Sequence, residues 1–132
     1  KLGCVPIQVN EDKNMRKYHH IGIPTTVQRP GETYLDRYDV HCTDDESSSF
    51  GIQWMRYGPR CDLPELVKTV AHVAFEVDDL DAEISGHEVL IAPNSPSAGV
   101  VVAFILESGA PIELLQFTGK NSAVSAPGHK PQ

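Results

Sequence analysis

The sequence has no long hydrophobic run and few basic residues. No apolar stretch in its 132 residues approaches the roughly 20 residues that a membrane-spanning helix needs, so we expect no membrane span. Only 11 lysines and arginines stand against 18 aspartates and glutamates, a net charge of −7. Because nucleic acids and anionic lipid surfaces attract basic proteins, this balance argues against both as partners.

Cysteine is also scarce. The chain has three cysteines, Cys4, Cys42 and Cys61, and no CxxC pair. An odd number without such a pair argues against a disulfide framework and against a thiolate metal site. Residues 1–14 lack the basic start and long apolar stretch of a secretory signal. We therefore expect a cytoplasmic protein.

The remaining composition is typical of one globular domain. The length suits a single domain of roughly 100–150 residues, and 40% hydrophobic with 22% charged residues is ordinary for a folded chain. We expect an N-terminal extension over residues 1–16, an ordered domain over 17–118 and a flexible tail over 119–132, where Gly, Ser, Ala, Pro and Lys prevail. Residues 5–9 are a candidate edge strand.

Runs of β-branched and aromatic residues predict a mostly β structure. Strands are expected at 18–23, 50–57, 70–77, 87–92, 100–106 and 111–117. Residues 32–43 are ambiguous between a strand and a helical turn, and the alternation of Tyr34, Tyr38, Val40 and Cys42 favours a strand.

Helices are expected to be few and short. The acidic pair before residues 80–85 predicts a helix there, because acidic side chains suit a helix N-terminus. One helical turn is expected at 64–67, within a connecting segment. Residues 93–99, PNSPSAG, are predicted to be a turn-rich loop.

The two halves of the chain repeat each other. The repeat aligns residues 18–25 with 70–77 and residues 50–57 with 110–117. In this alignment His20 falls on His72, and Gln53 falls on Glu113. Each half therefore begins with a strand carrying a histidine and ends with a strand carrying a long polar side chain. Because related halves bring equivalent strands together, these four side chains can converge.

Glu113 is the most informative of the four residues. It lies between Ile112 and Leu114 in an apolar strand, and burying an ionised carboxylate without a partner costs several kcal/mol. A cation, an arginine or a metal ion must then compensate its charge. A single strand histidine is more often structural than a ligand, and a single strand glutamate is more often solvated. The repeat favours the functional interpretation because it places four polar residues at equivalent positions.

The sequence resembles the vicinal oxygen chelate superfamily, which includes glyoxalase I, bleomycin resistance proteins and methylmalonyl-CoA epimerase. The resemblance covers residues 17–118 and is most specific in VAHVAFEVDDLDAEI and VVVAFILESGAPIELLQF, with HHIGIP similar to the first strand of the family. It implies an α+β fold with two βαβββ modules, at about 17–58 and 69–118, which form a curved-sheet cleft. The usual first-module helix looks reduced or missing in this sequence.

The resemblance also implies a metal site. Carried over residue by residue, the metal ligands are His20, Gln53, His72 and Glu113, with Glu113 as the catalytic base. Such nitrogen and oxygen ligands suit one divalent ion per site, either Zn, Ni, Co, Mn or Fe. The ion would act as a Lewis acid that stabilises an enolate or enediolate. The family resemblance further implies a small-molecule substrate and a homodimer.

Several neighbouring residues are weaker candidates. The possible cleft-lining residues are Glu76, His41 and Trp54, for which solvent exposure or core packing is the simpler explanation. His19 is expected to point away from His20, because successive strand residues face opposite sides. Arg56 and Arg60 are candidates to meet an anionic substrate, with surface charge as the alternative.

The sequence leaves three functions open. The favoured one is a metal-dependent lyase, isomerase or epimerase that acts on a small oxygenated substrate. A metal-free protein that sequesters a drug or another ligand, like bleomycin resistance proteins, is the alternative, although a full ligand set argues against it. The third is an extradiol-type Fe(II) dioxygenase using His20, His72 and Glu113. Gln53 argues against this one, because a fourth ligand would occupy a position that oxygen needs.

Overall fold

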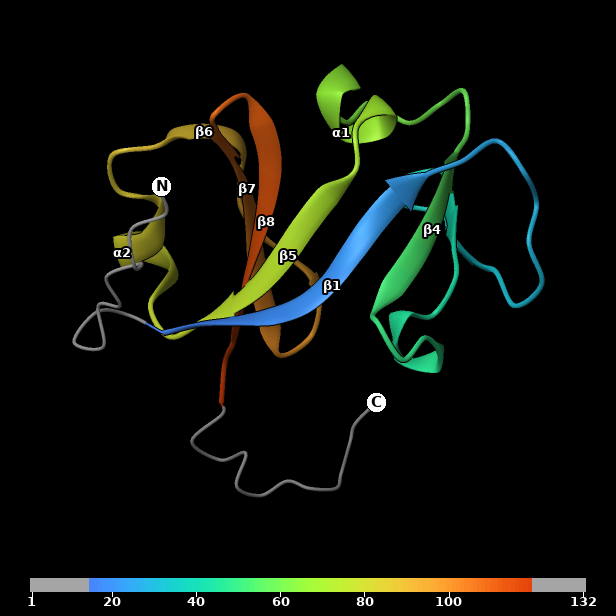
Figure 1. Cartoon of the computed structure of the whole chain (residues 1–132). Coiled ribbons are helices and arrows are strands. Elements are labelled where there is room, and N and C mark those ends of the chain that lie inside the picture. Colours follow the sequence, from blue (N-terminus) through green and yellow to red (C-terminus); the bar gives the residue numbers. More distant parts are fainter. Residues whose placement is uncertain (1–14, 120–132) are drawn as a thin grey trace, which may run out of the picture.

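The computed structural model describes residues 15–119, so the candidate edge strand at 5–9 lies outside the described residues, as do most of the two expected terminal segments. Figure 1 shows the order of the elements along the chain. The strands are β1 (Arg16–Pro24), β2 (Thr33–Leu35), β3 (Val40–Cys42), β4 (Ile52–Tyr57), β5 (His72–Val77), β6 (Glu88–Ser97), β7 (Val100–Glu107) and β8 (Ala110–Phe117). The helices are the 3-10 turn η1 (Asp45–Ser47), α1 (Glu65–Thr69) and α2 (Leu80–Ile84).

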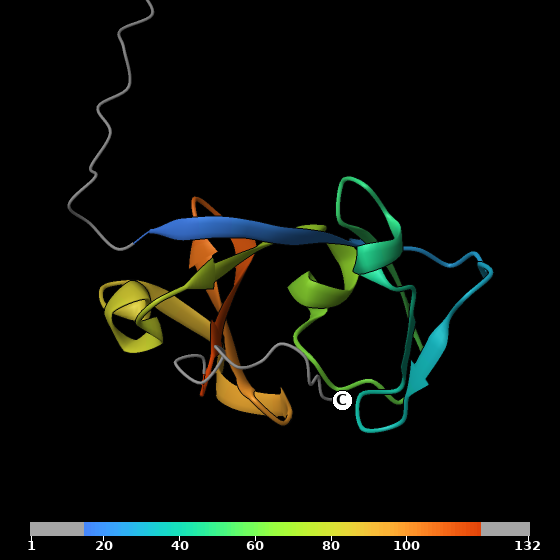
Figure 2. The same cartoon turned by 90° about the horizontal axis from the view of Figure 1, so that it is seen from below.

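The strands form one eight-stranded mixed sheet in the order β2-β3-β4-β1-β5-β8-β7-β6. β1 and β5 run antiparallel in the centre, and each has a parallel neighbour on its other side, β4 beside β1 and β8 beside β5. The sheet curls into a half-barrel, with its two ends on either side of the central strands (Figure 2). This mostly β architecture with few helices is consistent with the expected α+β class. Among the described residues, no helix is long and apolar enough to cross a membrane.

The strand register follows the internal repeat. The equivalent partners are Gly22–Gln53 and Ala74–Glu113 in the two parallel pairs, and His20–Ala74 and Gly22–His72 between β1 and β5. Residue pairs on one side of the centre thus recur on the other side. An approximate two-fold axis passes close to the Ile21–Val73 pair, where β1 meets β5. The repeat seen in the sequence is therefore a repeat of strand pairing.

Residues 32–43 form a hairpin, and the prediction of a single strand is wrong. The chain reverses where the Asp39 amide donates a hydrogen bond to the carbonyl of Asp36, and Asp39 has a positive φ of 53°. The Tyr34 hydroxyl donates to Oδ1 of Asp39 at 2.8 Å and ties β2 to this turn. The alternation of hydrophobic residues does not reveal this turn. The turn depends on a side-chain hydrogen bond that stabilises Asp39 in the left-handed region, which aspartate tolerates better than most residues.

The segment 93–97 belongs to β6, so most of the expected loop is strand. β6 is the last strand of the sheet and pairs only with β7 within the described part of the chain. Pro93 and Pro96 fit there because an edge strand has amide positions that need no partner. The short helices agree better with expectation. α2 begins after Asp79, whose side chain accepts from the Ala82 amide, and the predicted turn at 64–67 extends into α1.

The main hydrophobic core lies in the second half of the sheet. α2 covers one face, where the buried side chains are Val77, Leu80, Ala103, Ile105 and Leu114. The other face carries a second cluster with Ala74, Val100, Val102 and Leu115. In the first half, β1 and β2 are joined by a loop with no helix, and the Arg29 guanidinium lies 3.7 Å from the centre of the Trp54 ring. A stacked arginine therefore covers the first half where a helix covers the second.

Candidate functional site

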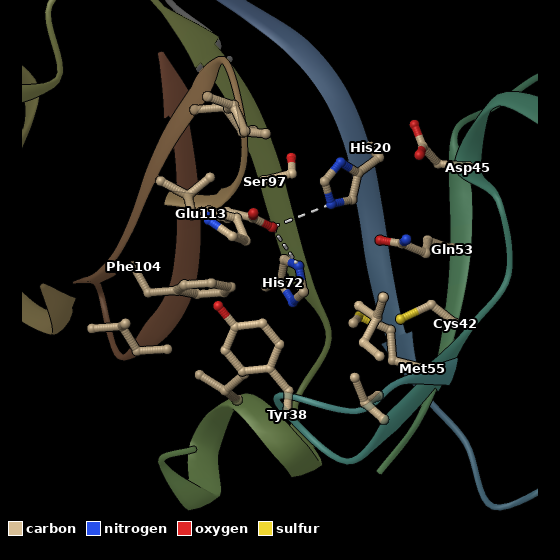
Figure 3. Close-up of a pocket in the computed structure, with 18 of the residues that line it drawn as sticks. His20, Tyr38, Cys42, Asp45, Gln53, Met55, His72, Ser97, Phe104 and Glu113 are labelled. Atoms are coloured by element: carbon tan, nitrogen blue, oxygen red, sulfur yellow. Dashed lines mark ion pairs between the residues drawn. The ribbon is translucent and has the colours of Figure 1, made fainter. Parts of the chain in front are cut away.

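The curled sheet holds a cavity of about 420 Å³. Strands from both halves and α1 contribute to its wall, and most of the lining side chains are apolar. The polar exceptions include His20 of β1, His72 of β5 and Glu113 of β8 (Figure 3). A mostly apolar pocket with a few convergent polar groups is the usual form of a small-molecule site.

Glu113 joins the two histidines at the centre of the cavity. Its Oε1 lies 3.2 Å from Nε2 of His20 and 3.0 Å from Nε2 of His72. The exposed fractions of the three side chains are 13% for Glu113, 7% for His20 and 3% for His72. One potential ligand atom from each residue lies within 4.8 Å of those of the other two. The structure thus brings together three of the four residues that the resemblance named as metal ligands.

Gln53, the fourth named residue, lines the same cavity from β4. Its side chain points toward the histidines (Figure 3). Gln53 lies opposite Gly22 as Glu113 lies opposite Ala74, so the repeat places the two side chains on the same face of the sheet. The cavity therefore holds two imidazoles, one carboxylate and one amide.

The charge of Glu113 is compensated inside the cavity. Burial acts to raise the pKa of Glu113, but hydrogen bonds from His20 and His72 and the attraction of their charges outweigh it and hold the pKa at about 2. The carboxylate is therefore ionised at neutral pH. A divalent cation would compensate it equally well, and two imidazoles with a carboxylate are donors that such ions prefer. The donor set fits a divalent metal ion.

His19 faces the cavity together with His20, and the expectation that the two point apart is wrong. Tyr18 pairs with Phe75 of β5 and His20 pairs with the adjacent Ala74, so the ladder skips His19. Such an extra residue is a β-bulge, which interrupts the alternation of side chains. Both histidines consequently line the same cavity.

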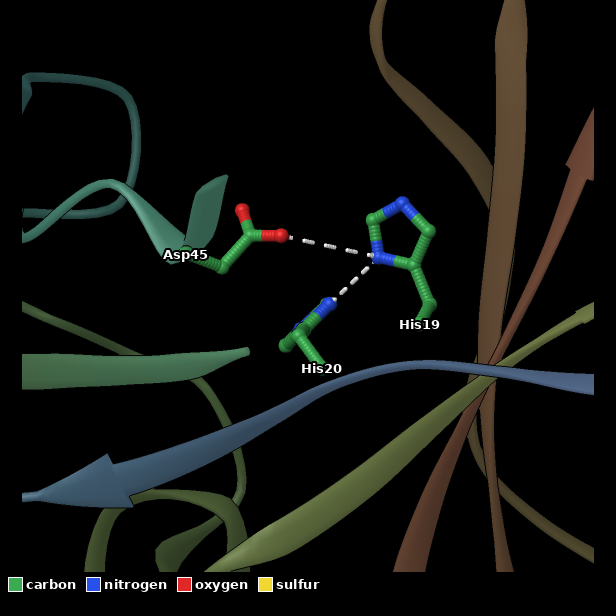
Figure 4. Close-up of side chains that lie close together, drawn as sticks. All are labelled: His19, His20 and Asp45. Atoms are coloured by element: carbon green, nitrogen blue, oxygen red, sulfur yellow. Dashed lines mark hydrogen bonds and ion pairs between the residues drawn. The ribbon is translucent and has the colours of Figure 1, made fainter. Parts of the chain in front are cut away.

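The two histidines form a hydrogen bond through their Nδ1 atoms, which lie 2.7 Å apart (Figure 4). Nδ1 of His19 also lies 3.9 Å from Oδ2 of Asp45, which follows β3. One Nδ1 must donate and the other must accept, so a single proton lies between them. When that proton belongs to His20, its Nε2 keeps a free lone pair for a cation. The adjacent histidines were visible in the sequence, but the bulge that unites them was not.

Gly22 leaves space for the ring of His72. A Cβ built at position 22 would lie 2.6 Å from Nε2 of that ring, much closer than atoms can pack. Gly22 is thus required by a close approach and not by an unusual backbone angle. Sequence reasoning did not single out this glycine, although it lies within the HHIGIP motif.

The three weaker cleft candidates do not line this cavity. Glu76 lies near the end of β5 and is half-buried. The His41 ring packs against Tyr34, with ring centres 4.5 Å apart. Trp54 stacks beneath Arg29 on the other face of β4. Neighbouring strand positions face opposite sides, which explains why Gln53 lines the cavity and Trp54 does not.

The two arginines that were candidates for an anionic substrate are both paired elsewhere. Arg56 forms a two-pronged ion pair with Glu32, through contacts of 2.6 and 3.0 Å. Arg60 donates to the Tyr34 hydroxyl at 3.0 Å and lies 3.6 Å from Oδ1 of Asp39. Neither arginine lines the cavity.

Comparisons with known proteins support the fold alone. No model of a known protein family matches the sequence, and no curated protein matches it. Among solved structures, the chain is similar to the hypothetical protein BH1468 from Bacillus halodurans C-125, with a TM-score of 0.54 and 13% identity. The match covers 89% of this chain and 98% of that chain. At this low identity, the likeness supports the curled mixed sheet and carries no information about function.

Proposed function

We propose that this protein is a metal-dependent lyase, isomerase or epimerase of the vicinal oxygen chelate type, with the two halves of the sheet as its two modules. One observation carries the proposal. His20 and His72, from the equivalent strands β1 and β5, meet Glu113 of β8 in a cavity of about 420 Å³. Isolated buried histidines need only a hydrogen-bond partner, whereas this arrangement also supplies a donor set for a cation.

The proposed centre uses His20, His72, Glu113 and Gln53 to hold one divalent ion. When bound, the ion would act as a Lewis acid for a substrate with two adjacent oxygens and would stabilise negative charge on them. We also assign Glu113, as a ligand that would loosen from the ion, as the base that accepts a proton from the substrate carbon, because it is the carboxylate beside both histidines. The Phe104 ring packs edge-on against His72, with ring centres 4.9 Å apart, and helps to keep that imidazole in place and water away.

The alternative functions require different features of the cavity. Its apolar lining would also suit a protein that sequesters a flat organic molecule, which is the second candidate. An extradiol-type dioxygenase is less favoured, because Gln53, whose side chain points toward the histidines (Figure 3), would occupy a coordination position that oxygen needs. A cytoplasmic location and a homodimer remain predictions. The free, buried thiols of Cys42 and Cys61 are compatible with a reducing compartment.

The decisive experiment is metal analysis of the purified protein after reconstitution. Wild type should hold about one divalent ion per chain, and His72→Ala and Glu113→Ala should lose it. His87→Ala is the matched control, since His87 pairs with Glu107 away from the cavity and its loss should leave the ion in place. A folded wild type that binds no divalent ion would exclude the proposal and favour the ligand-sequestering alternative. If the wild type does bind an ion, the next assay is proton exchange at the carbon next to a carbonyl, measured on the loaded protein.

A further inference from the structure

Apart from its histidines, the cavity is lined by charged side chains of one sign only. Among the described residues no lysine or arginine lines it, and its carboxylates are Asp45, Glu46 and Glu113. With a divalent ion bound, three carboxylates still leave a net negative charge at neutral pH. A substrate whose phosphate or carboxylate groups lie in the cavity away from the ion would therefore meet repulsion, and the described lining offers no lysine or arginine to pair with them.

Basic side chains lie close by in the sequence but bind elsewhere. Three of them stand next to a lining residue in the chain, namely Arg37, Arg56 and Lys68. Arg56 and Lys68 bind groups that do not line the cavity, Arg56 to Glu32 at 2.6 Å and Lys68 to the Cys61 carbonyl at 2.9 Å. Arg37 donates to the Ser95 carbonyl at 3.3 Å, beside the lining residues Asn94 and Pro96, and is itself not part of the lining. The Arg56 and Glu32 charges neutralise each other. The absence of positive charge from the cavity thus reflects where these side chains are held.

Apart from the proposed metal ligands, most of the cavity wall is apolar. α1 and the segment before it contribute Val67 and Leu63, while β3, β4 and β7 contribute Val40, Met55 and Phe104. Moving an ionised group into such surroundings without a partner costs several kcal/mol, whereas an apolar group gains from burial there. The wall therefore favours a hydrocarbon or aromatic body attached to the oxygens that reach the ion.

We infer that the substrate is a neutral, largely apolar molecule whose two adjacent oxygens bind the metal, and not a molecule bearing phosphate or carboxylate groups. This inference rests on the proposed function and restricts the class of substrate on which the protein would act. Substrates attached to a charged carrier are excluded to the extent that the carrier must enter the cavity. The binding energy comes from the apolar body, and the two oxygens fix its orientation at Glu113.

Two probes with the same metal-binding group test the inference. Benzohydroxamic acid presents two adjacent oxygens on an uncharged ring, and 4-sulfobenzohydroxamic acid adds one weakly coordinating negative charge. Calorimetric titration of the zinc-loaded protein should show at least about tenfold tighter binding of the uncharged probe, since each tenfold corresponds to about 1.4 kcal/mol. Leu35→Arg places a cation on the cavity wall at a side chain that is 41% exposed, and it should reduce this preference. Leu35→Gln is the neutral control and should keep it.

The outcomes separate this inference from the proposal on which it rests. A loaded protein that binds the sulfonated probe equally well or more tightly would overturn the inference, as would a loaded protein that binds neither probe. Failure to load any of the divalent ions Zn, Ni, Co, Mn and Fe, or equal affinity for the uncharged probe with and without the ion, would instead overturn the metal-dependent function.

Discussion

The first half of the sheet, β1 to β4, and the second half, β5 to β8, place residues at the same register positions but fill them differently. Opposite Gln53 stands Gly22, while opposite Glu113 stands Ala74. The strands that flank this frame also differ, since β2 and β3 have three residues each and β6 and β7 have ten and eight. The pairing of the four inner strands is therefore the shared feature, and the outer strands are free to diverge.

The segment that covers each half is attached at the same strand position. In the first half, Arg56 of β4 binds Glu32 of the loop that follows β1. In the second half, Gln116 of β8 accepts a hydrogen bond from the Leu80 amide at the start of α2, at 2.8 Å. Positions 56 and 116 are equivalent in the repeat. A loop can thus replace a helix as long as this strand position still holds the covering segment.

The largest expected effect concerns the core. Leu114 of the second half is 2% exposed, so Leu114→Ala should lower the free energy of unfolding by about 2–5 kcal/mol. Its equivalent in the first half, Trp54, is half-buried beneath Arg29, and Trp54→Ala should cost less despite removing more atoms. Urea unfolding of both variants measures the difference. An equal or larger loss for Trp54→Ala would contradict the view that the second half carries the core.

Exchanging the polar residues of the two final strands tests the site. Glu113→Gln gives both halves a glutamine at this strand position. It should weaken zinc binding on the order of 100-fold or more, which is above the range typical of residues that only support a ligand. Gln53→Glu gives both halves a glutamate at this position. It should tighten zinc binding, because it adds a negative charge beside the ion. Competition with a chromophoric chelator measures both. Unchanged affinity in Glu113→Gln would remove Glu113 from the ligand set.

The bulge in β1 distinguishes the two histidine strands, and its effect is expected to be smaller. His19→Ala removes the hydrogen-bond partner of Nδ1 of His20 and should weaken zinc binding by about tenfold, as is usual for such partners. His19→Asn keeps an acceptor close to the former Nδ1 and should recover most of the affinity. Equal affinity for His19→Ala and wild type, at equal melting temperature, would show that the pairing does not support the centre.

The smallest effect is a pH dependence confined to the first half. The hydrogen bond from Arg56 lowers the pKa of Glu32 from 4.5 to about 2, against a smaller opposing effect of burial. Because the pKa is lower in the folded state, the pair stabilises the protein above about pH 5, and this contribution disappears as the pH falls toward 2. Unfolding free energies of wild type and Glu32→Gln should therefore converge over this range. Gln116→Ala, in the other half, should differ from wild type by the same amount throughout.

The sequence predicted the parts of the fold and site that follow from regular strands. His20, His72 and Glu113 were found because the repeat aligned them and because an apolar strand cannot hold a carboxylate without compensation. The hairpin at Asp39 was missed, since a turn held by a side-chain hydrogen bond leaves little trace in alternation. The position of His19 was missed for a related reason. A β-bulge shifts one residue to the other face of the sheet, and no local sequence pattern predicts where a bulge occurs.

The contact between Gly22 and the His72 ring also constrains how the chain can misfold. Slippage of β5 along β1 by one residue would turn His72 to the opposite face of the sheet. Slippage by two residues would restore its direction but place His20 or Pro24 beneath the imidazole in place of Gly22. Neither residue leaves the space that the ring occupies. A residue that contributes no side chain to the cavity therefore selects the native pairing of the two central strands over its nearest competitors.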